Sequence, residues 1–166
     1  MPPTDQSMPP IEGLYRQYGA PLLLFAISIC GETSRAQDAV HQVFLTLMET
    51  NNLMNALDPK AYLFASVRNF LFNDNKHRKR NVGIEADQLW FTPPDRDHAA
   101  ELNLRRALQA LPEDQRQVVV LHIWGELTFA QVAEVLSIGA NTAASRYRYA
   151  LTKLREAMVV KEKASV

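Results

Sequence analysis

The chain has 166 residues, of which 47% are hydrophobic, so it can form one domain of ordinary size or two small ones, and disorder throughout is excluded. Its 18 basic and 18 acidic residues balance, which excludes a global attraction to nucleic acid or to a membrane surface. Cys30 is the only cysteine, so an internal disulfide and a thiolate metal cluster are excluded. The N-terminus lacks the pattern of a signal peptide, and the apolar run 22–29 is too short to cross a bilayer. We therefore expect a soluble cytoplasmic protein without a membrane span.

Three helices are predicted in the first half of the chain. Apolar residues at helical spacing predict the first over Ile11–Cys30, with Gly31 as its stop. Thr33 or Ser34 can cap the second, which the asparagines from Asn51 onward interrupt. Asp58 and Pro59 begin the third, which runs on into a basic end. Three such helices can close a small core.

The third helix combines three features that suit a single strand of nucleic acid. Asn69 and Asn73 supply amides one turn apart, and Phe64 and Phe72 supply rings. The basic end supplies phosphate contacts through Lys76, Arg78, Lys79 and Arg80. Aromatic faces, amides and positive charge together suit unstacked bases. The alternative is that the cations only complement the dipole of a solvated helix C-terminus.

A linker is predicted over residues 81–100, where a glycine, adjacent prolines and several acids interrupt any periodicity. Trp90 and Phe91 within it are expected to dock on a neighbouring surface. Helices resume over Glu101–Leu111 and again from Pro112 to a stop at Gly125. The sequence thus predicts an all-α protein of two small helical domains, 11–80 and 101–160, joined by a flexible linker.

The stretch Leu127–Leu154 predicts a helix-turn-helix, which completes the second domain. Thr128 and Gln131 have the spacing of a capping box at the start of the first helix. The turn is expected at Ser137–Ala140, with Gly139 supplying an unusual backbone angle and Asn141 capping the following helix.

The second helix of this motif has one apolar and one polar, basic face. The apolar stripe consists of Ala143, Tyr147, Ala150, Leu151, Leu154 and Met158. Largely off this stripe lie Thr142, Ser145, Arg146, Tyr149 and Lys153. A helix fits the DNA major groove, where hydroxyls, amides and guanidiniums meet phosphates and base edges. The pattern therefore favours DNA binding over catalysis, the alternative being an ordinary helical hairpin with solvated arginines.

The order of these parts resembles the extracytoplasmic-function sigma factors of the sigma-70 family. The resemblance covers nearly the whole chain after Ile11. In the first half LYRQYGAPLLLFA, AQDAVHQVFLTLME and AYLFASVRNFLFND are similar to family region 2, and in the second the run from ALPEDQRQVVV to LTKLRE is similar to region 4. The resemblance implies a non-enzymatic subunit that binds core RNA polymerase and promoter DNA, needs no cofactor, and can be held by an anti-sigma factor.

The resemblance also implies roles for matching positions. The helix that meets the polymerase clamp in the family carries Asp38, Gln42 and Phe44. Asn69, Asn73 and the basic end from Lys76 match the positions that hold the melted strand of the minus-ten element, and Phe64 lies near the loop that captures a flipped base. The major groove of the minus-thirty-five element is entered by positions matching Asn141, Thr142, Ser145, Arg146 and Arg148. Lys153 extends this basic face.

Three positions depart from the family pattern. Gln37 stands where an acidic residue is frequent and His41 where a glutamine is frequent, which alters the inferred clamp contact. Ala144 replaces a frequent lysine on the recognition helix, so one phosphate or base contact is expected to be missing.

Two other classes of function remain open from the sequence. A stand-alone dimeric helix-turn-helix regulator explains only the second half of the chain and should bind half-sites about one helical turn apart without polymerase. An enzymatic or metal-binding role finds little support, because the four histidines are far apart in the sequence and no nucleophile or nucleotide-binding motif is present.

Overall fold

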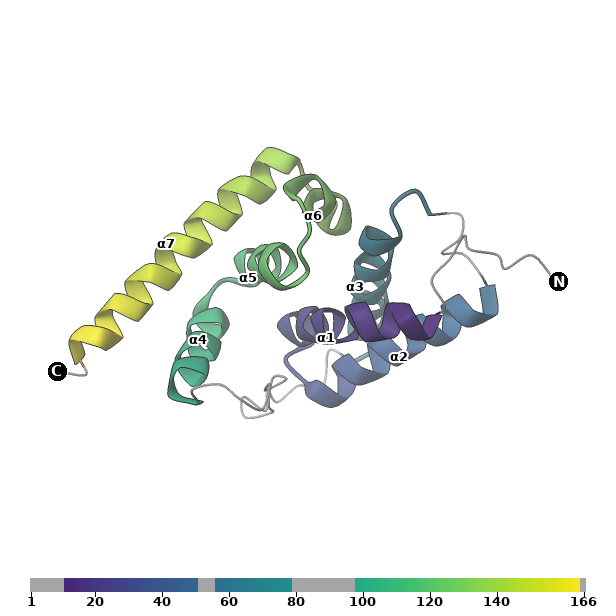
Figure 1. Cartoon of the computed structure of the whole chain (residues 1–166), viewed down its shortest axis with the longest axis horizontal. Coiled ribbons are helices and arrows are strands. Elements are labelled where there is room, and N and C mark those ends of the chain that lie inside the picture. The colour runs from purple at the N-terminus through teal and green to yellow at the C-terminus, as the bar shows by residue number, and fades with distance from the viewer. Residues whose placement is uncertain (1–10, 51–55, 79–97, 165–166) are drawn as a thin grey trace.

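A computed structural model describes residues 11–50, 56–78 and 98–164, and it describes side chains over 11–50, 56–73 and 103–159. Within these residues the secondary structure is entirely helical. Figure 1 shows the helices of the first half on one side of the molecule and those of the second half on the other, with the long last helix extending away from the body.

The helices of the first half lie where the local signals predict, except that the second begins at Thr33, so Thr33 and Ser34 lie in its first turn and are not its cap. α1 spans Ile11–Cys30 and α2 spans Thr33–Thr50. Gly31 separates them with a positive φ of 72°, a backbone conformation that glycine adopts without steric cost. α3 spans Pro59–Arg78, and the Asp58 side chain accepts a hydrogen bond from the Ala61 amide at 3.1 Å, which confirms Asp58 as its N-terminal cap.

The second half contains α4 (His98–Ala110), α5 (Glu113–Val119), a π-helical turn η2 (Val120–Trp124), α6 (Phe129–Leu136) and α7 (Ala140–Ala164). α4 therefore begins inside the segment predicted as linker, while residues 79–97, with Trp90 and Phe91, lie outside the described part of the chain.

The π-helical turn η2 was not predicted from the sequence. In it the amide of Gly125 donates to the carbonyl of Val120, five residues earlier, at 3.0 Å. A Cβ atom on Gly125 would lie 2.5 Å from the Leu121 carbonyl oxygen. The widened turn therefore requires glycine at this position for steric reasons, in addition to ending the helix there.

The helix-turn-helix is formed by α6 and α7. Both hydrogen bonds of the predicted capping box are present, from the Gln131 amide to Thr128 Oγ1 at 3.2 Å and from the Thr128 amide to Gln131 Oε1 at 2.9 Å. The turn differs from the prediction, because Ser137 and not Gly139 takes the left-handed conformation, with φ 55°. α7 begins at Ala140, so Asn141 lies in its first turn and is not its cap.

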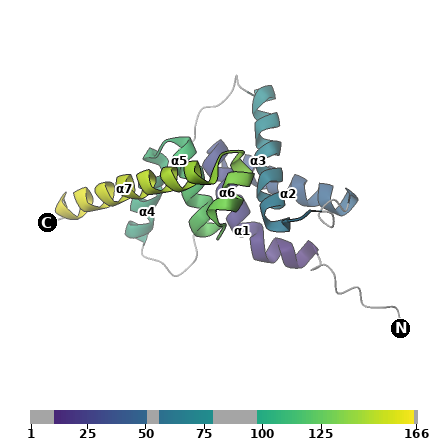
Figure 2. The same cartoon turned by 90° about the horizontal axis from the view of Figure 1, so that it is seen from above.

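The two halves pack against each other through one continuous apolar cluster. α3 packs on α6, and α1 packs on α5 and η2. Figure 2 shows α1 and α3 adjoining α5 and α6 from a second direction. The sequence predicted a separate core for each half, because apolar periodicity identifies buried faces but not the helix that covers them.

Hydrogen bonds between described residues also join the two halves. Gln131 Nε2 donates to Asp58 Oδ2 at 3.0 Å, Lys60 Nζ donates to the Glu126 carbonyl at 2.9 Å, and Arg116 Nη1 donates to the Ser28 carbonyl at 3.2 Å. The first links the N-terminal caps of α3 and α6 directly, because Asp58 caps α3 and Gln131 completes the capping box of α6. The two helices thus begin side by side.

None of the helices within residues 11–50, 56–78 and 98–164 is both long and apolar enough to cross a membrane.

Candidate nucleic-acid interface

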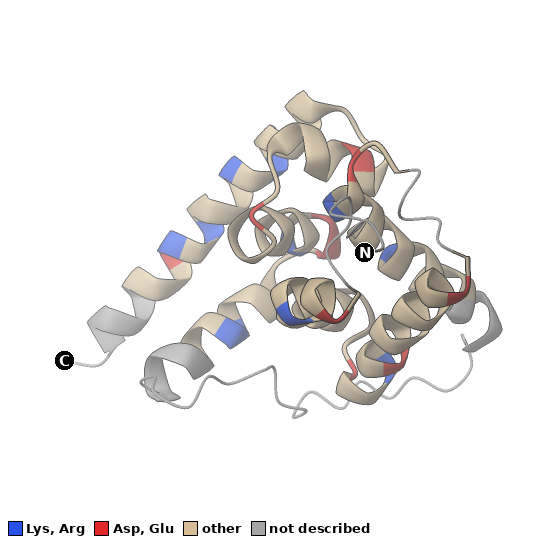
Figure 3. Cartoon of the chain, turned by 45° about the vertical axis from the view of Figure 1, so that its right-hand side comes forward, with Lys and Arg blue, Asp and Glu red and all other residues tan. Residues whose placement is uncertain are grey.

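The outward face of α7 carries most of the side chains predicted to enter the major groove. Asn141, Thr142, Arg148 and Lys153 are exposed, and Arg148 Nη2 donates to Ser145 Oγ at 3.2 Å. Figure 3 shows basic positions repeating along α7. Tyr149, which is 65% exposed, adds a large side chain that the sequence analysis placed off the apolar stripe without assigning it to the interface.

The inward face of α7 packs on α5 and α6. Ala143, Ala150 and Leu154 are buried, which confirms these members of the predicted stripe, whereas Met158 is 48% exposed because α7 extends past the helices that cover it. The Tyr147 ring packs against His122 and Phe129, with centroid distances of 4.6 and 5.4 Å. These contacts fix the recognition helix to the body of the second half.

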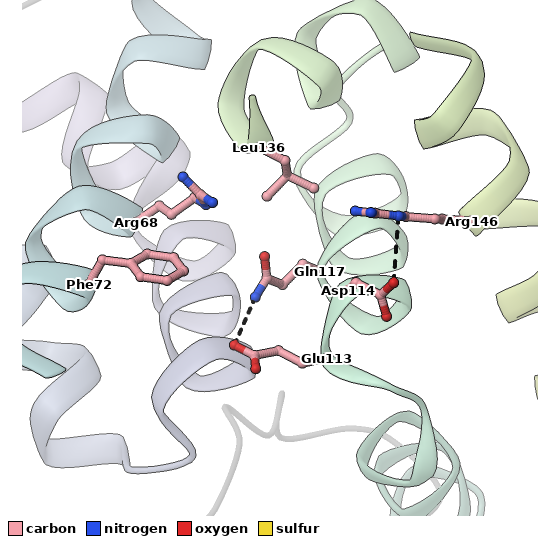
Figure 4. Close-up of a pocket in the computed structure, with 7 residues that line it drawn as sticks. All are labelled: Arg68, Phe72, Glu113, Asp114, Gln117, Leu136 and Arg146. Atoms are coloured by element: carbon pink, nitrogen blue, oxygen red, sulfur yellow. Dashed lines mark hydrogen bonds and ion pairs between the residues drawn. The ribbon is translucent and has the colours of Figure 1, made fainter. Parts of the chain in front are cut away.

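Arg146 lies apart from the outward set. Its side chain lines a cleft of about 420 Å³ together with Arg68, Phe72, Glu113, Asp114, Gln117 and Leu136. Its Nε atom lies 3.5 Å from Asp114 Oδ2. Figure 4 shows Arg146 pointing toward Asp114, with Arg68 and Phe72 on the opposite wall.

A second groove lies between α2 and α3 and has a volume of about 260 Å³. Its walls are formed by Gln42, Val43, Thr46, Leu47, Tyr62, Ser66, Asn69 and Phe70. Gln42 and Asn69, which the sequence assigned to different partners, therefore line the same groove. Apolar and aromatic walls with a few amides and hydroxyls form a surface that can accept an unstacked base.

Phe64 was predicted to lie near a captured base, but in this structure its side chain is not accessible to a ligand. Its ring is fully buried and meets Phe25 edge-on, with centroids 5.8 Å apart. α3 packs against α1 and α2 on one side and against α6 on another. These contacts leave little of its surface free, and the Phe64 ring therefore belongs to the hydrophobic core. Phe72, at 41% exposed, lies instead in the cleft beside Arg68.

The basic end of α3 is described only in part. Asn69 and Asn73 are exposed, one turn apart, as predicted. Lys76 and Arg78 belong to the helix, but their side chains lie outside the described set, and Lys79 and Arg80 lie outside the described residues altogether.

The outward face of α2 carries Asp38 and Gln42, both exposed as predicted. Phe44, assigned to the same surface, is buried against Tyr15 with ring centroids 5.2 Å apart, and we correct it to a core residue. Leu45 and Met48, at 53% and 60% exposed, form an apolar strip that was not predicted from the sequence. The signal was in the sequence, since both fall off the apolar stripe of a helix whose outer face should be polar.

His41 and Gln37, which depart from the family pattern, line a groove of about 420 Å³ between α1 and α2. The His41 Nε2 atom lies 3.4 Å from the Tyr15 hydroxyl, and the two rings are stacked with centroids 6.3 Å apart. At the position where the resemblance leads us to expect a glutamine amide, this chain thus has an imidazole ring that packs on Tyr15 of α1.

Two ionisable groups in the described part of the chain have shifted pKa values. Burial raises the pKa of the Cys30 thiol. Burial lowers the pKa of Arg116, while the nearby Glu113 carboxylate acts in the opposite direction. Among the described residues no group of three or more His, Cys, Asp or Glu side chains is placed to hold a metal ion.

The chain is similar to known proteins over most of its length. The family model described as Sigma-70, region 4 matches residues 101–154. The ECF RNA polymerase sigma factor EcfG of Rhodopseudomonas palustris is 30% identical over 144 residues, covering 84% of this chain and 80% of that protein. The ECF RNA polymerase sigma factor SigL of Mycobacterium tuberculosis is 30% identical over 154 residues, covering 87% of this chain and 86% of that protein.

The fold also has a solved counterpart. The sigma factor RpoE of Bartonella quintana, in co-crystal with the anti-sigma factor NepR, superposes with a TM-score of 0.69 at 22% identity, covering 89% of this chain and 97% of that one. These relatives do not favour the alternative of a stand-alone dimeric regulator. The chain belongs to the ECF RNA polymerase sigma factors, as the resemblance implied, and its function is to direct transcription initiation.

Proposed function

We propose that the two halves of this sigma factor divide promoter recognition between them. The second half places the outward face of α7 in the major groove of the minus-thirty-five element. The observation that best supports this role is that Asn141, Thr142, Ser145 and Arg148 lie on an exposed or half-exposed side of a helix whose other side is packed on α5 and α6, with Lys153 exposed further along the helix. A recognition helix needs such a division between a rigid support and a free polar surface.

The first half takes the melted strand of the minus-ten element. The groove between α2 and α3 would receive a flipped base, with Asn69 contacting its edge and the Tyr62 and Phe70 rings forming the walls. Asn73 continues the polar face one turn further along α3, toward the basic end formed by Lys76, Arg78, Lys79 and Arg80.

The outward face of α2 binds core RNA polymerase. Asp38 and Gln42 supply polar contacts, and the exposed Leu45 and Met48 supply apolar area next to them. An apolar strip with polar residues beside it is typical of a protein interface. The polymerase provides the chemistry, so this chain acts without a catalytic group or cofactor of its own, inside the cytoplasm.

An anti-sigma factor is a further partner under this proposal. The structural relative RpoE was solved with the anti-sigma factor NepR, and its fold matches both halves of the present chain. A partner that binds both halves at once would hold them together and keep them from the two promoter elements.

The test is transcription with purified core polymerase, a promoter library and this chain as the added factor. Asn69→Ala and Asn73→Ala are expected to leave binding to closed duplex unchanged and to reduce melting, which permanganate reactivity of unpaired thymines measures. Gln17→Ala, at an exposed position of α1 outside the proposed DNA and polymerase surfaces, serves as the control. Transcription that does not depend on the added chain, or equal melting in the variants and the unaltered chain, contradicts the proposal.

A further inference from the structure

Arg146 is the predicted groove residue whose side chain turns inward. It lines the cleft between α3, α5, α6 and α7, and Figure 4 shows it extending toward Asp114. The Nε atom of Arg146 lies 3.5 Å from Asp114 Oδ2, and the side chain of Arg146 is 32% exposed against 51% for that of Asp114. The Nε side of the guanidinium therefore faces a partner within the protein, and its terminal nitrogens extend into the cleft.

The helical positions explain this orientation. Successive residues of an α-helix are rotated by about 100°, so Arg146 lies roughly 60° from Ala143 and roughly 40° from Ala150 around α7. Both alanines are fully buried. Arg148 lies roughly 140–160° from the same two residues, on the opposite side of the helix. A helix that turns Arg148 into a groove therefore keeps Arg146 on the side of α5.

Asp114 is a fixed acceptor for this arginine. It lies in the first turn of α5, where the helix dipole stabilises a carboxylate, and its Oδ1 accepts a hydrogen bond from the Gln115 amide at 2.9 Å. The adjacent acid, Glu113, accepts instead from Gln117 Nε2 at 3.1 Å, within α5. Asp114 is thus the acid of this turn that reaches α7.

We propose that Arg146 is a positioning residue, which fixes the rotation and depth of α7 against α5 through Asp114 and contacts no base. The proposal rests on the proposed groove role of α7. Both residues belong to the second half, so their ion pair persists if the two halves separate. The two small alanines on either side of Arg146 allow α5 and α7 to approach closely, and the ion pair sets the angle at which they meet.

The experiment uses holoenzyme reconstituted from core polymerase and the full chain, with a duplex DNA library randomised over the upstream element. The bound fraction is sequenced, and the affinity for the preferred duplex is measured. The variants are Arg146→Ala, Asp114→Ala, both together, and the exchanged pair Asp114→Arg with Arg146→Asp. Arg148→Ala tests the proposed groove face, and Arg106→Ala, exposed on α4, controls for the loss of one positive charge.

For a positioning pair, both single variants lower the affinity by a similar factor, about two- to fivefold as for other partly exposed ion pairs, and leave the preferred bases unchanged. The double variant is no weaker than either single one, because the two residues act through one contact. The exchanged pair recovers part of the loss, because the new arginine restores the contact but opposes the dipole of α5, and a base-contacting arginine shows no recovery at all.

Two results overturn the proposal. One is a change of base preference at a single position in Arg146→Ala with none in Asp114→Ala, which would make Arg146 a base-contacting residue. The other is unchanged affinity in both single variants. Circular dichroism of each variant shows whether its total helix content equals that of the unaltered chain. The groove role of α7 fails separately, if Arg148→Ala keeps both the affinity and the preference of the unaltered chain.

Discussion

Arg116 donates hydrogen bonds to four backbone carbonyl groups from two helices. Its guanidinium donates to the carbonyls of Leu108, Gln109 and Leu111 at the end of α4, at 2.9 to 3.1 Å, and to the Ser28 carbonyl of α1 at 3.2 Å. The carbonyls at a helix C-terminus have no partner within the helix, and a cation there also complements the dipole. Arg116 therefore ties the ends of α1 and α4 to α5.

We expect Arg116→Ala to lower the free energy of unfolding by about 2–4 kcal/mol, because several carbonyls lose a charged donor at once. Arg116→Lys should recover only part of this, since an ammonium cannot span the same acceptors as the planar guanidinium. Urea unfolding measures both. Arg106→Ala, an exposed arginine on α4, should change stability by at most about 0.5 kcal/mol, and an equal loss in this control would contradict the assigned role.

The free energy of unfolding should depend on pH in the alkaline range because of Cys30. Burial raises the pKa of its thiol above the ordinary value of 9.0, so the unfolded chain loses the thiol proton at a lower pH than the folded chain. The stabilisation is fully present below about pH 9 and is lost as the pH rises through the folded pKa. Cys30→Ala should therefore show a shallower loss of stability above pH 9 than the unaltered chain, measured by urea unfolding at a series of pH values.

At the scale of the element, the turn between α6 and α7 contains one residue with a positive φ, Ser137, and a glycine without one, Gly139. Ser137 has φ 55° and is exposed, whereas Gly139 has no positive φ, and a Cβ on it would lie 3.7 Å from Thr142 Oγ1, an ordinary contact. The left-handed conformation costs a residue with a Cβ roughly 1 kcal/mol, and a glycine that does not need its freedom destabilises the folded state entropically. Glycine would therefore be more favourable at position 137, which is left-handed, than at position 139, where it occurs.

Ser137→Gly should accordingly raise the free energy of unfolding by about 1 kcal/mol, and Gly139→Ala should raise it by about 0.4–1 kcal/mol. Thermal unfolding of the two variants measures the effect. A loss of stability in Gly139→Ala would mean that Gly139 holds the strained angle that the sequence pattern suggested. Gly125→Ala provides the contrast, because its Cβ would meet the Leu121 carbonyl and should cost about 1–3 kcal/mol.

At the scale of the whole molecule, the packed halves are too close together to contact both promoter elements. The elements lie roughly 25 base pairs apart, or about 80 Å at 34–36 Å per turn of DNA. A compact protein of this length has a radius of gyration of about 15 Å. The contacts between α3 and α6 and between α1 and η2 must therefore open when both elements are bound.

The hydrogen bond from Gln131 to Asp58 offers a way to open the halves without unfolding them. In Gln131→Glu the new carboxylate can still accept from the Thr128 amide and keep the capping box, but it faces the Asp58 carboxylate. We expect the radius of gyration in solution scattering to increase by several ångströms relative to the unaltered chain, as a rough estimate from the size of the separated halves.

A second substitution should reverse this change. Asp58→Asn in the Gln131→Glu background supplies an amide donor to the new carboxylate, while its oxygen can still cap α3, so the compact form should return. Gln17→Glu adds the same charge on an exposed face of α1 and should leave the radius unchanged. An unchanged radius in Gln131→Glu would show that the apolar contact alone holds the halves together.

Most of the helices could be predicted from the sequence because their causes are local. The Asp58 cap, the Gly31 stop and the Thr128 capping box each involve residues within four positions of one another. The polar face of α7 and the asparagines of α3 could be found for the same reason, since helical periodicity places them on the surface. The π-helical turn escaped prediction because no local spacing distinguishes a glycine that ends a helix from one that also widens its last turn.

The side chains that were misplaced depend on contacts between segments far apart in the chain. Phe64 and Phe72 are both aromatic residues of α3, and the packing of that helix on its neighbours buries the first against Phe25 of α1 and leaves the second at the cleft. Arg146 was predicted as a groove residue, and under the proposed positioning role its direction depends on Asp114, 32 positions earlier by their numbers in the chain. Which residue meets which partner is a property of the packed core, and no pattern of neighbours along the sequence specifies it.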